Sequence, residues 1–339
     1  MSDVLVAGGG PIGLATALHL HDAGLSVTVI EPRQGPIDKA CGEGLMPGAV
    51  RSLAELGVNP IGQDVLGIRY CDAKRTAEAP FRHGLGRGVR RTELQRALRA
   101  AVDERAIPVL RGVVSSITQT RHGIIADDRS ARYLVAADGL HSGVRKSMNL
   151  AASTEPGTRR WGQRRHFELN PWSGFIEVHW GADAEAYVTP VGDGLVGVAI
   201  LSSSRSPFEQ QLQEFPELIE QLGDAPRSTV LGAGPLRQSA SRRVAGRVLL
   251  VGDAAGYVDA LTGEGIAVGL DSARRLARCL AADRPEEFES EWRRSSRRYR
   301  LITGSLLRAS AVPALRGALV PFAHRAPALF GGVVGQLSR

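Results

Sequence analysis

A glycine-rich turn near the N-terminus is the first group of residues whose spacing could do chemistry. Gly8, Gly10 and Gly13 stand in the pattern G-x-G-x-x-G, between an apolar run and a helix-like segment. In such a turn the first glycine permits a tight bend, the second lets the backbone approach a pyrophosphate, and the third lets helix and strand pack closely. The N-terminus of the following helix then faces the phosphates. The turn therefore predicts a dinucleotide site.

Acidic residues end three of the predicted strands. Glu31 ends the second strand, 18 residues after Gly13, where its carboxylate can accept hydrogen bonds from both ribose hydroxyls. Asp138 and Asp253 follow two later strands and lie 115 residues apart. Acids at the carboxyl edge of one sheet suit a long cofactor that crosses this edge. Because the ribityl chain of a flavin needs an acceptor such as Asp253 and NAD has no such chain, the pattern favours FAD over NAD.

The elements that must position these residues begin as a strand–helix–strand unit. Residues 3–7 are predicted to form a buried strand, 12–23 a helix and 25–31 a second strand. Alternating strands and helices are typical of a parallel sheet. Further helices are expected at 47–57, 92–105 and 264–282, and further strands at 107–111, 113–119, 131–137 and 247–251.

A different pattern covers residues from about 160 to 201. Strands follow one another there with no helix between them, at 165–169, 175–180, 186–190 and 195–201. This pattern is typical of an antiparallel sheet, which we expect to form a second lobe. The predicted fold class is α/β: a Rossmann-like FAD-binding parallel sheet, an antiparallel-sheet substrate lobe and C-terminal helices. We expect a discontinuous FAD-binding domain at 1–155 and 233–285, the substrate lobe at 156–232, and a helical, basic and apolar tail at 286–339.

Composition and charge argue against several other classes of protein. The chain has 339 residues and a net charge of +7, but Trp292–Arg339 contains nine arginines and no acidic residue, so the rest carries −2. A basic character confined to one end, with only 5% aromatic residues, argues against a nucleic-acid partner. Cys41, Cys71 and Cys279 are too few for a disulfide scaffold or a zinc site, and the histidines lack metal-binding spacing. No metal is expected.

The sequence also bears on location. No run of 18 apolar residues is present, which argues against a membrane span, and the first strand begins too early for a signal peptide. A cytoplasmic protein is therefore expected. Arg293–Arg300 and the apolar groups that follow could contact an anionic membrane surface, which would make the protein membrane-peripheral. The alternative is a solvated basic helix with further helices packed on the second lobe, which is favoured because Pro313, Pro321 and Pro327 interrupt any long amphipathic helix.

Three motifs carry a resemblance to a known family: the glycine-rich turn with Glu31, the D-G-x-x-S-x-x-R segment that starts at Asp138, and the pair Gly252-Asp253. In this order they resemble the FAD-binding group with the para-hydroxybenzoate hydroxylase fold, which includes aromatic hydroxylases, flavin halogenases and geranylgeranyl reductases. The resemblance runs from residue 3 to about residue 282. It implies that the first motif holds the ADP part of FAD, that Asp138-Gly139 support the pyrophosphate region, and that Gly252-Asp253 hold the ribityl chain.

Finer matches point to one branch of this group. Arg91 begins an R-x-x-L-x-x-x-L segment, where the group has an arginine that reaches toward the cofactor, and Asp38–Pro47 is similar to the K-x-C-G-x-G-L-x-P segment of geranylgeranyl reductases. Thr262–Ile266 also fits that branch, and a helix N-terminus there would stabilise the negative charge of a reduced flavin. The expected cofactor contacts are Gly8, Gly10, Pro11, Ile12, Gly13, Glu31, Arg33, Cys41, Gly42, Arg91, Asp138, Gly139, Gly252, Asp253, Gly263, Gly265 and Ile266.

Two residues of the Asp38–Pro47 loop are candidate catalytic groups. Cys41 could be a redox or substrate-contacting thiol, but no partner cysteine or basic activator is identifiable nearby, which favours a small loop residue. Glu43 could donate a proton, but a solvated or backbone-capping carboxylate is favoured. No other catalytic residue is predicted.

The resemblance implies an FAD-dependent oxidoreductase that acts on an apolar small molecule. The leading reaction is that of geranylgeranyl reductases, hydride transfer from the flavin to a C=C bond. Tyr187–Pro190 lacks the Trp and Phe of the Y-x-W-x-F-P tunnel segment, and the W-x-W-x-I-P signature of halogenases is missing. One alternative is therefore an NAD(P)H-dependent monooxygenase that hydroxylates or epoxidises an aromatic, polyketide or lipid substrate. An alternative of another class is a flavoprotein electron carrier that docks at a membrane. The reductant would be NAD(P)H or a protein electron donor.

Overall fold

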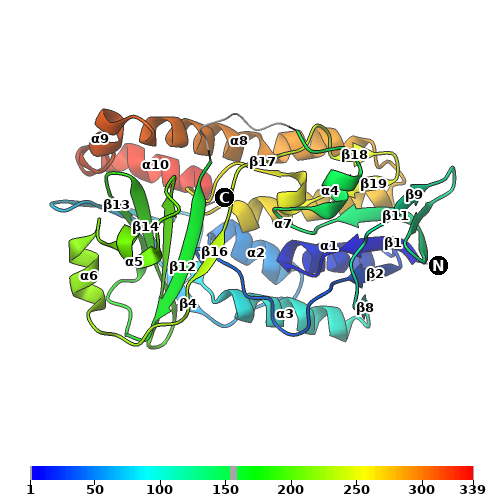
Figure 1. Ribbon diagram of the computed structural model, residues 1–339, viewed down its shortest axis with the longest axis horizontal. Helices are drawn as coiled ribbons and strands as arrows, with labels where there is room; N and C mark the ends of the chain where they lie inside the picture. Colours follow the sequence, from blue (N-terminus) through cyan, green and yellow to red (C-terminus); the bar gives the residue numbers. More distant parts are fainter. Residues whose placement is uncertain (1, 153–158, 339) are drawn as a thin grey trace.

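The computed structural model describes residues 2–152 and 159–338. The predicted strand–helix–strand unit is present, with its two strands in the first sheet and its helix packed on that sheet (Figure 1). Strand β1 (Ser2–Ala7) pairs in parallel with β2 (Val27–Ile30) and with β11 (Arg129–Ala136). Its residues Val4, Leu5 and Val6 are buried, as expected for a central parallel strand covered on both faces. The unit predicted at 3–31 is therefore confirmed.

The first sheet has eight strands, in the order β18-β19-β11-β1-β2-β8, with β10 paired to β11 and β9 paired to β10. The strand predicted at 247–251 returns to this sheet as β19, beside β11, so the sheet is built from two distant parts of the chain. The remaining strands are β8 (Val109–Leu110), β9 (Ile117–Gln119), β10 (Ile124–Ala126), β18 (Val244–Ala245) and β19 (Val248–Leu250).

Helices pack on this sheet through their apolar faces. Leu14 and Leu18 of α1 (Pro11–Asp22), Leu98 of α3 and Leu276 of α7 share one buried core with Val6. Pro11 opens α1, a position that tolerates proline because the first N–H groups of a helix have no intrahelical partner. The other helices of this part are α2 (Pro47–Glu55), α3 (Arg91–Glu104), α4 (Gly143–Ser147) and α7 (Gly265–Ala281).

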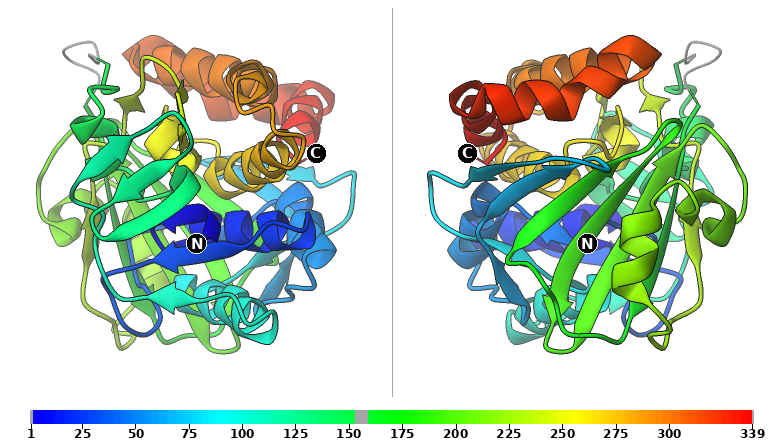
Figure 2. Two further views of the ribbon diagram at one scale, coloured as in Figure 1. Left: turned by 90° about the vertical axis from the view of Figure 1, so that its right-hand side faces the viewer. Right: turned by 90° about the vertical axis from the view of Figure 1, so that its left-hand side faces the viewer.

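The second sheet has seven strands, in the order β16-β12-β15-β14-β13-β5-β6, and forms the second lobe (Figure 2). Four of its strands occupy the region where an antiparallel sheet is predicted: β12 (Trp161–Phe167), β13 (Phe175–Trp180), β14 (Ala184–Gly192) and β15 (Leu195–Ser202). The other three are β5 (Gly67–Cys71), β6 (Thr76–Pro80) and β16 (Leu231–Ala233). Two short helices, α5 (Phe208–Leu212) and α6 (Pro216–Leu222), belong to this lobe.

The predicted domain boundaries need one correction in this sheet. They place residues 67–80 in the FAD-binding domain, whereas β5 and β6 form one edge of the second sheet, and β5 pairs with β13 in parallel. Both strands are short, and β13, the partner that joins β5 to the second sheet, lies about a hundred residues away in the sequence. Only tertiary contact therefore assigns β5 and β6 to the second lobe. The predicted boundary at 155/156 lies outside the described residues.

Small sheets and turns complete the chain between these layers. Strands β3 (Gly44–Leu45), β7 (Gly86–Gly88) and β4 (Gln63–Val65) form a three-stranded sheet, and β17 (Gln238–Ser239) pairs with β20 (Gly256–Tyr257). A single 3₁₀ turn (Gly252–Ala255) follows β19.

Three helices form the C-terminal part: α8 (Glu287–Ser310), α9 (Pro313–Arg325) and α10 (Pro327–Leu337). Two of them begin at the predicted breaks, Pro313 and Pro327. Pro321, which is also predicted to interrupt a helix, lies inside α9 and does not end it. Helix α8 packs on α7, while α9 and α10 lie against β5 and β6 at the edge of the second sheet (Figures 1 and 2). Among the described residues no single helix is long and apolar enough to span a membrane, although α8 and α9, bent by 115°, meet this length and composition requirement together.

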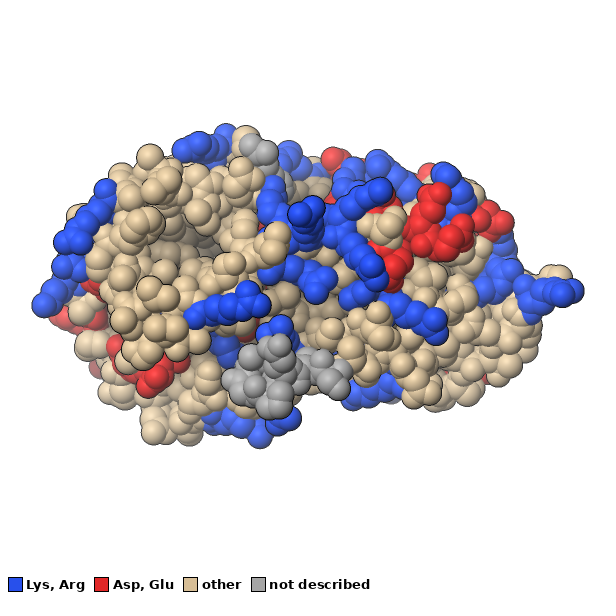
Figure 3. Space-filling view, turned by 90° about the horizontal axis from the view of Figure 1, so that it is seen from above, with Lys and Arg blue, Asp and Glu red and all other residues tan. Residues whose placement is uncertain are grey.

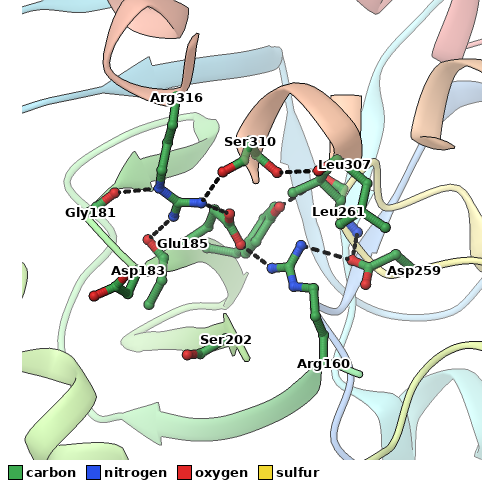
Figure 4. A network of polar contacts seen from close by, with 12 residues as sticks. Arg160, Gly181, Asp183, Glu185, Ser202, Asp259, Leu261, Leu307, Ser310 and Arg316 are labelled. Atoms are coloured by element: carbon green, nitrogen blue, oxygen red, sulfur yellow. Dashed lines mark hydrogen bonds and ion pairs between the residues drawn. The ribbon is translucent and has the colours of Figure 1, made fainter. Parts of the chain in front are cut away.

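A buried cluster of ion pairs fastens this helical part to the second sheet (Figure 4). Glu185 of β14 is fully buried and pairs with Arg160 and, at 2.7 Å, with Arg316 of α9. Arg316 also donates to the backbone oxygens of Gly181 and Ala184. Arg160 lies 3.5 Å from a carboxylate oxygen of Asp259, on the loop before α7. The cluster therefore joins the second sheet, the α7 loop and α9.

Candidate active site

One cavity of about 460 Å³ takes its walls from both sheets and from the C-terminal helix. Of the seventeen residues predicted to contact the cofactor, all but Gly13 and Glu31 line it. Its polar part is lined by Gly8, Gly10, Pro11, Ile12, Arg33, Lys39, Cys41, Gly42, Glu43, Arg91, Asp138, Gly139, Gly252, Asp253, Gly263, Gly265 and Ile266. Residues from six separate segments of the sequence thus meet at one place.

The glycine-rich turn leaves the N-terminus of α1 open to the cavity. Gly8 has a φ of +107°, and a Cβ there would lie 2.5 Å from the carbonyl oxygen of Ala137. A Cβ on Gly13 would lie 1.9 Å from the carbonyl oxygen of Gly8, so this glycine serves packing and does not line the cavity. A Cβ on Gly10, by contrast, would meet no atom closer than a guanidinium nitrogen of Arg91, at 4.0 Å. The space in front of the helix terminus can therefore accept a phosphate.

Glu31 lies just behind this turn. Its carboxylate accepts hydrogen bonds from the backbone N–H of Gly9 at 2.7 Å and from Nε of Arg33 at 2.7 Å. Burial by itself would raise the pKa of Glu31, but these hydrogen bonds lower it below its ordinary value. Arg33 lines the cavity, whereas Glu31 does not.

The D-G-x-x-S-x-x-R segment and the Gly252-Asp253 turn are joined by one arginine. Arg145 donates to the backbone oxygens of Asp253 at 3.2 Å and Ala254 at 3.0 Å, and to that of Leu140 at 2.8 Å. Asp138 accepts from the backbone of α4, while its other oxygen is buried without a partner among the described residues. Arg145 is the last residue of the D-G-x-x-S-x-x-R motif, but it is not among the predicted cofactor contacts.

Positive charge collects around the open end of α1. Lys39, Arg33 and Arg91 all line the cavity, and Lys39 lies close enough to Gly139 that a Cβ there would be 3.5 Å from its Nζ. Burial lowers the pKa of Lys39, and the charges of Arg33 and Arg91 lower it further. Arg33 is paired with Glu31, but Lys39 and Arg91 form no ion pair among the described residues, so two cations beside a helix N-terminus lack an anion and this part of the cavity fits a pyrophosphate.

Asp253 lies on the opposite side of this cluster, on the turn after β19. Burial raises the pKa of its carboxyl group above the ordinary value, while the charges of Arg91, Lys39 and Arg145 lower it. No hydrogen bond to its carboxylate is made by the described residues, so its oxygens are available to a ligand with hydroxyl groups. These features fit the ribityl part of FAD.

The two catalytic candidates line the cavity in different environments. Burial raises the pKa of the Cys41 thiol, which therefore stays protonated and is a poor nucleophile. Glu43 has a φ of +58°, and its two oxygens are held by the backbone N–H of Arg91 at 2.8 Å and by Nε2 of His166 at 2.7 Å. Glu43 is thus a capping and positioning carboxylate in this arrangement.

His166 and Arg164 of β12 extend this contact across the two lobes. Arg164 is hydrogen-bonded to Nδ1 of His166 at 3.0 Å and forms an ion pair with Asp38. Asp38 and Glu43 flank Cys41 and Gly42, so β12 fixes both ends of the loop that carries these cavity residues. His166 and Arg164 are distant in sequence from this loop, and no local pattern identifies them as its partners.

The N-terminus of α7 reaches the cavity from a third direction. Gly263 has a φ of +69°, and Gly265 and Ile266 line the wall beside it. Glu264 points elsewhere: it is 4% exposed, and one of its oxygens is buried without a partner among the described residues. Burial raises the pKa of Glu264 from 4.5 to about 8. The helix end can stabilise a negative charge in the cavity, while Glu264 does not line it.

The second part of the cavity is apolar. Its walls come from the inward face of the second sheet, from the loop before α7 and from the inner face of α10. Tyr187 donates its hydroxyl to the backbone oxygen of Leu261 at 2.8 Å and so presents its ring to the cavity. The apolar lining residues are Met46, Ile68, Tyr70, Ile176, Val178, Tyr187, Ala199, Leu201, Leu236, Leu261, Val334 and Leu337.

The only group of possible metal ligands found among the described residues lies outside this cavity. Ligand atoms of Cys71, Glu177 and His179 lie within 4.8 Å of one another. Glu177, however, already accepts from Arg69 at 2.6 Å and from the indole of Trp172 at 3.1 Å. This carboxylate is therefore neutralised and hydrogen-bonded without a metal.

Comparison with known proteins decides the family. The family described as "FAD binding domain" matches residues 1–176, which is half of the chain. The chain belongs to this FAD-binding family. The matched region holds the glycine-rich turn, the Asp38–Pro47 loop and the D-G-x-x-S-x-x-R segment, and the flavoprotein is an FAD-dependent oxidoreductase.

Relatives of this flavoprotein carry the names of reductases. A menaquinone reductase of Mycobacterium tuberculosis is 29% identical over 316 residues, covering 82% of this chain and 76% of that protein. A digeranylgeranylglycerophospholipid reductase of Methanothrix thermoacetophila is 28% identical, covering 78% of this chain and 73% of that protein. The expected resemblance to the geranylgeranyl reductase branch is confirmed.

Solved structures establish the fold of this flavoprotein. A triple mutant of the flavin-dependent brominase Bmp2 superposes with a TM-score of 0.85 at 17% identity and covers 100% of this chain and 94% of that one. A mutant of the halogenase PltM in complex with FAD gives a TM-score of 0.73 at 16% identity, over 86% of this chain and 72% of that one. At such identity the likeness concerns the fold alone, and it confirms the predicted fold class.

Proposed function

We propose that this flavoprotein reduces a C=C bond in an apolar, lipid-like substrate. The observation that carries the proposal is the composition of the cavity: a cradle fitted to FAD continues into a chamber with aliphatic and aromatic walls. Similarity to menaquinone and digeranylgeranylglycerophospholipid reductases, whose names denote apolar substrates, supports this substrate class.

The residues of the polar part have distinct roles in this proposal. The N-terminus of α1 with Lys39, Arg33 and Arg91 binds the pyrophosphate, and Asp253 accepts hydrogen bonds from the ribityl hydroxyls. Arg145 holds the Asp253 turn in place through backbone oxygens. When bound, FAD would supply the two-electron chemistry, hydride transfer, that the reduction of a C=C bond requires.

The residues around the ring position serve orientation and charge. The Asp38–Pro47 loop, fixed by Glu43 and His166, brings the backbone of Gly42 to the cavity, and the N-terminus of α7 stabilises negative charge there. The apolar walls exclude water and orient the substrate, which lowers the entropic cost of bringing the two reactants together. Electrons reach the flavin from NAD(P)H or from a protein electron donor.

Anaerobic turnover tests this function. The purified protein should be yellow, and after anaerobic reduction it should convert a polyprenyl alkene, such as geranylgeraniol, into a product with two more hydrogen atoms, measured by mass spectrometry. A product that contains oxygen and forms only in air would instead establish a monooxygenase. Fast reduction by a protein donor with no product under either condition would establish an electron carrier.

The reductant is identified in the same assay. NADH, NADPH and a low-potential ferredoxin are supplied separately without oxygen, and the bleaching of the flavin absorbance is followed. A reductase that uses a nicotinamide should be reduced rapidly by one of the two nucleotides, whereas dependence on ferredoxin alone would assign a protein donor.

A further inference from the structure

Helices α9 and α10 carry large apolar side chains on their exposed sides. Of the twelve large apolar side chains exposed in the described residues, six lie between Leu301 and Val333. Phe322 of α9 is 58% exposed and Leu329 of α10 is 62% exposed. Seen from above in Figure 3, the part of the surface over these helices is uncharged and hollowed, with basic side chains along its margin. A surface of this kind marks an interaction site.

The exposed apolar residues follow helical spacing. On α9, Leu315 and Phe322 are seven residues apart and so lie on one face, and on α10 Leu329 and Val333 are four apart. These four residues are called the apolar face below. Most helices at the surface of a protein have a polar outer side. The apolar face departs from this pattern, which indicates that it binds a partner that is itself apolar.

The opposite side of α10 is the wall of the apolar chamber. Phe330 and Val334 belong to the buried core of the second lobe, and Val334 and Leu337 line the cavity. Helix α10, Pro327–Leu337, contains no charged residue. One apolar helix therefore separates the substrate chamber from the outside, with apolar side chains on both of its sides.

Arginines border the apolar face. Arg308 lies in the last turn of α8 and Arg325 ends α9, and both are exposed. Arg298 donates to the side-chain oxygen of Gln336 on α10 at 3.4 Å. Earlier on α8, by contrast, Arg293 pairs with Glu289. No acidic residue occurs after Glu291, so the C-terminal helices themselves contribute only positive charge to the border of the face.

This charge distribution selects among partners. In a symmetric dimer the same patch meets itself, which would place arginines against arginines with no carboxylate from this region to separate them. An anionic bilayer offers phosphates to the arginines and acyl chains to the apolar residues, which is the match for both features. The face therefore fits a membrane surface better than a second copy.

We propose that α9 and α10 dock this protein on an anionic lipid bilayer. Leu315, Phe322, Leu329 and Val333 enter the acyl boundary, and the surrounding arginines contact the headgroup phosphates. Docking brings the wall of the apolar chamber to the bilayer, from which an apolar substrate reaches the chamber past α10. The binding surface stands on its own observations, whereas its purpose rests on the proposed function.

Vesicle sedimentation of the FAD-loaded full chain tests this docking. Vesicles of phosphatidylcholine with phosphatidylglycerol should bind the protein. Vesicles of phosphatidylcholine alone should bind it at least roughly tenfold more weakly, and added salt should weaken its binding to the anionic vesicles. The double variant F322S/L329S should lose at least roughly tenfold in binding. The matched control I61S/V113S changes two residues that are 81% and 65% exposed elsewhere, and it should bind as the unchanged protein does.

Three further measurements make the outcome unambiguous. Flavin content and thermal unfolding of each variant show that it is folded, and R308Q/R325Q should reduce the preference for phosphatidylglycerol. Equal binding of F322S/L329S and the unchanged protein would overturn the proposal. So would a doubled mass in analytical ultracentrifugation that this variant abolishes, because the face would then join two copies.

Turnover separates this proposal from the proposed function. A short water-soluble alkene needs no membrane, so F322S/L329S should reduce it at the rate of the unchanged protein while losing turnover of a polyprenyl alkene in vesicles. If neither protein reduces any alkene, the proposed function fails while the vesicle-binding result stands by itself.

Discussion

Single carboxyl groups in this flavoprotein behave according to their surroundings and not according to their type. Glu31 is held ionised by Arg33, Asp253 is half-buried and faces cations, and Glu264 is buried with no hydrogen bond to one oxygen. Three different consequences follow: a structural anchor, an acceptor for a ligand and a group that keeps its proton.

Replacing Asp253 by alanine should weaken FAD binding. The ribityl hydroxyls lose a charged acceptor, which costs about 1.5–3 kcal/mol, or roughly ten- to a hundredfold in affinity. The measurement is the ratio of flavin to protein absorbance after gel filtration, followed by titration with FAD. Asp64→Ala, at an exposed carboxylate, is the control; unchanged occupancy in Asp253→Ala would remove the assigned role.

Glu264 should make stability depend on pH. The pKa of its carboxyl group is about 8 in the folded protein and 4.5 ordinarily, so between these values the folded chain holds a proton that the unfolded chain has released. Because the folded state then binds more protons, the free energy of unfolding falls as pH rises from about 4.5 to 8.

Melting temperatures with saturating FAD from pH 5 to pH 8.5 test this expectation. Glu264→Gln replaces the acid by a neutral group of similar shape, so its melting temperature should fall less over this range than that of the unchanged protein. Parallel curves for the two proteins would show that Glu264 keeps its ordinary pKa.

Helix termini decide where ligand charge can lie at the scale of elements. The N-termini of α1 and α7 both open to the cavity, and each is preceded by a glycine with positive φ, Gly8 and Gly263. Helix α1 can approach β1 this closely only because Gly13 has no side chain. The phosphate site therefore depends on helix packing as much as on direct contacts.

Gly13→Ala should displace α1 and impair FAD binding. Its Cβ would lie 1.9 Å from a backbone oxygen that cannot move without moving the whole turn. Strongly reduced flavin occupancy and a lower melting temperature are expected, measured by absorbance and by thermal unfolding. Gly304→Ala is the control. Gly304 lies inside α8, and a Cβ there would have no atom within 4 Å apart from the neighbouring backbone of its own helix, so this substitution should stabilise the folded protein by about 0.5–1 kcal/mol.

At the scale of the whole molecule, buried ion pairs join α9 to the second sheet (Figure 4). Arg316 and Arg160 together neutralise Glu185, and Arg160 also reaches toward Asp259. Since α10 closes the apolar chamber, the position of the C-terminal helices is a condition for the shape of the site.

Arg316→Ala should loosen the C-terminal helices. The variant leaves a buried carboxylate with one partner fewer, which costs about 3–5 kcal/mol when a buried pair is broken. Urea unfolding should show the lower stability, and limited proteolysis should cut α9 and α10 faster than in the unchanged protein. Arg325→Ala, at the exposed end of α9, is the control; equal proteolysis of both variants would show that the ion pairs do not hold this part in place.

The site could be predicted from sequence where its parts are local. The glycine-rich turn, the acids after parallel strands and the start of α7 each follow from residues that are neighbours along the chain, because turns and helix termini have short-range steric requirements. Fifteen of the seventeen predicted cofactor contacts line one cavity for this reason. The family match agrees with the predicted cofactor.

Only the tertiary structure placed the residues whose partners are distant in the sequence. Three contacts join segments that are about a hundred residues or more apart: Arg145 with the Asp253 turn, His166 with Glu43, and β5 with β13. The periodicity of a single segment does not indicate which distant segment it will contact. The apolar tail is a further case: composition showed that α9 and α10 are apolar, but packing decided which side lines the chamber and which faces out. Sequence determined the chemistry of each segment, and long-range packing decided which segments share a site.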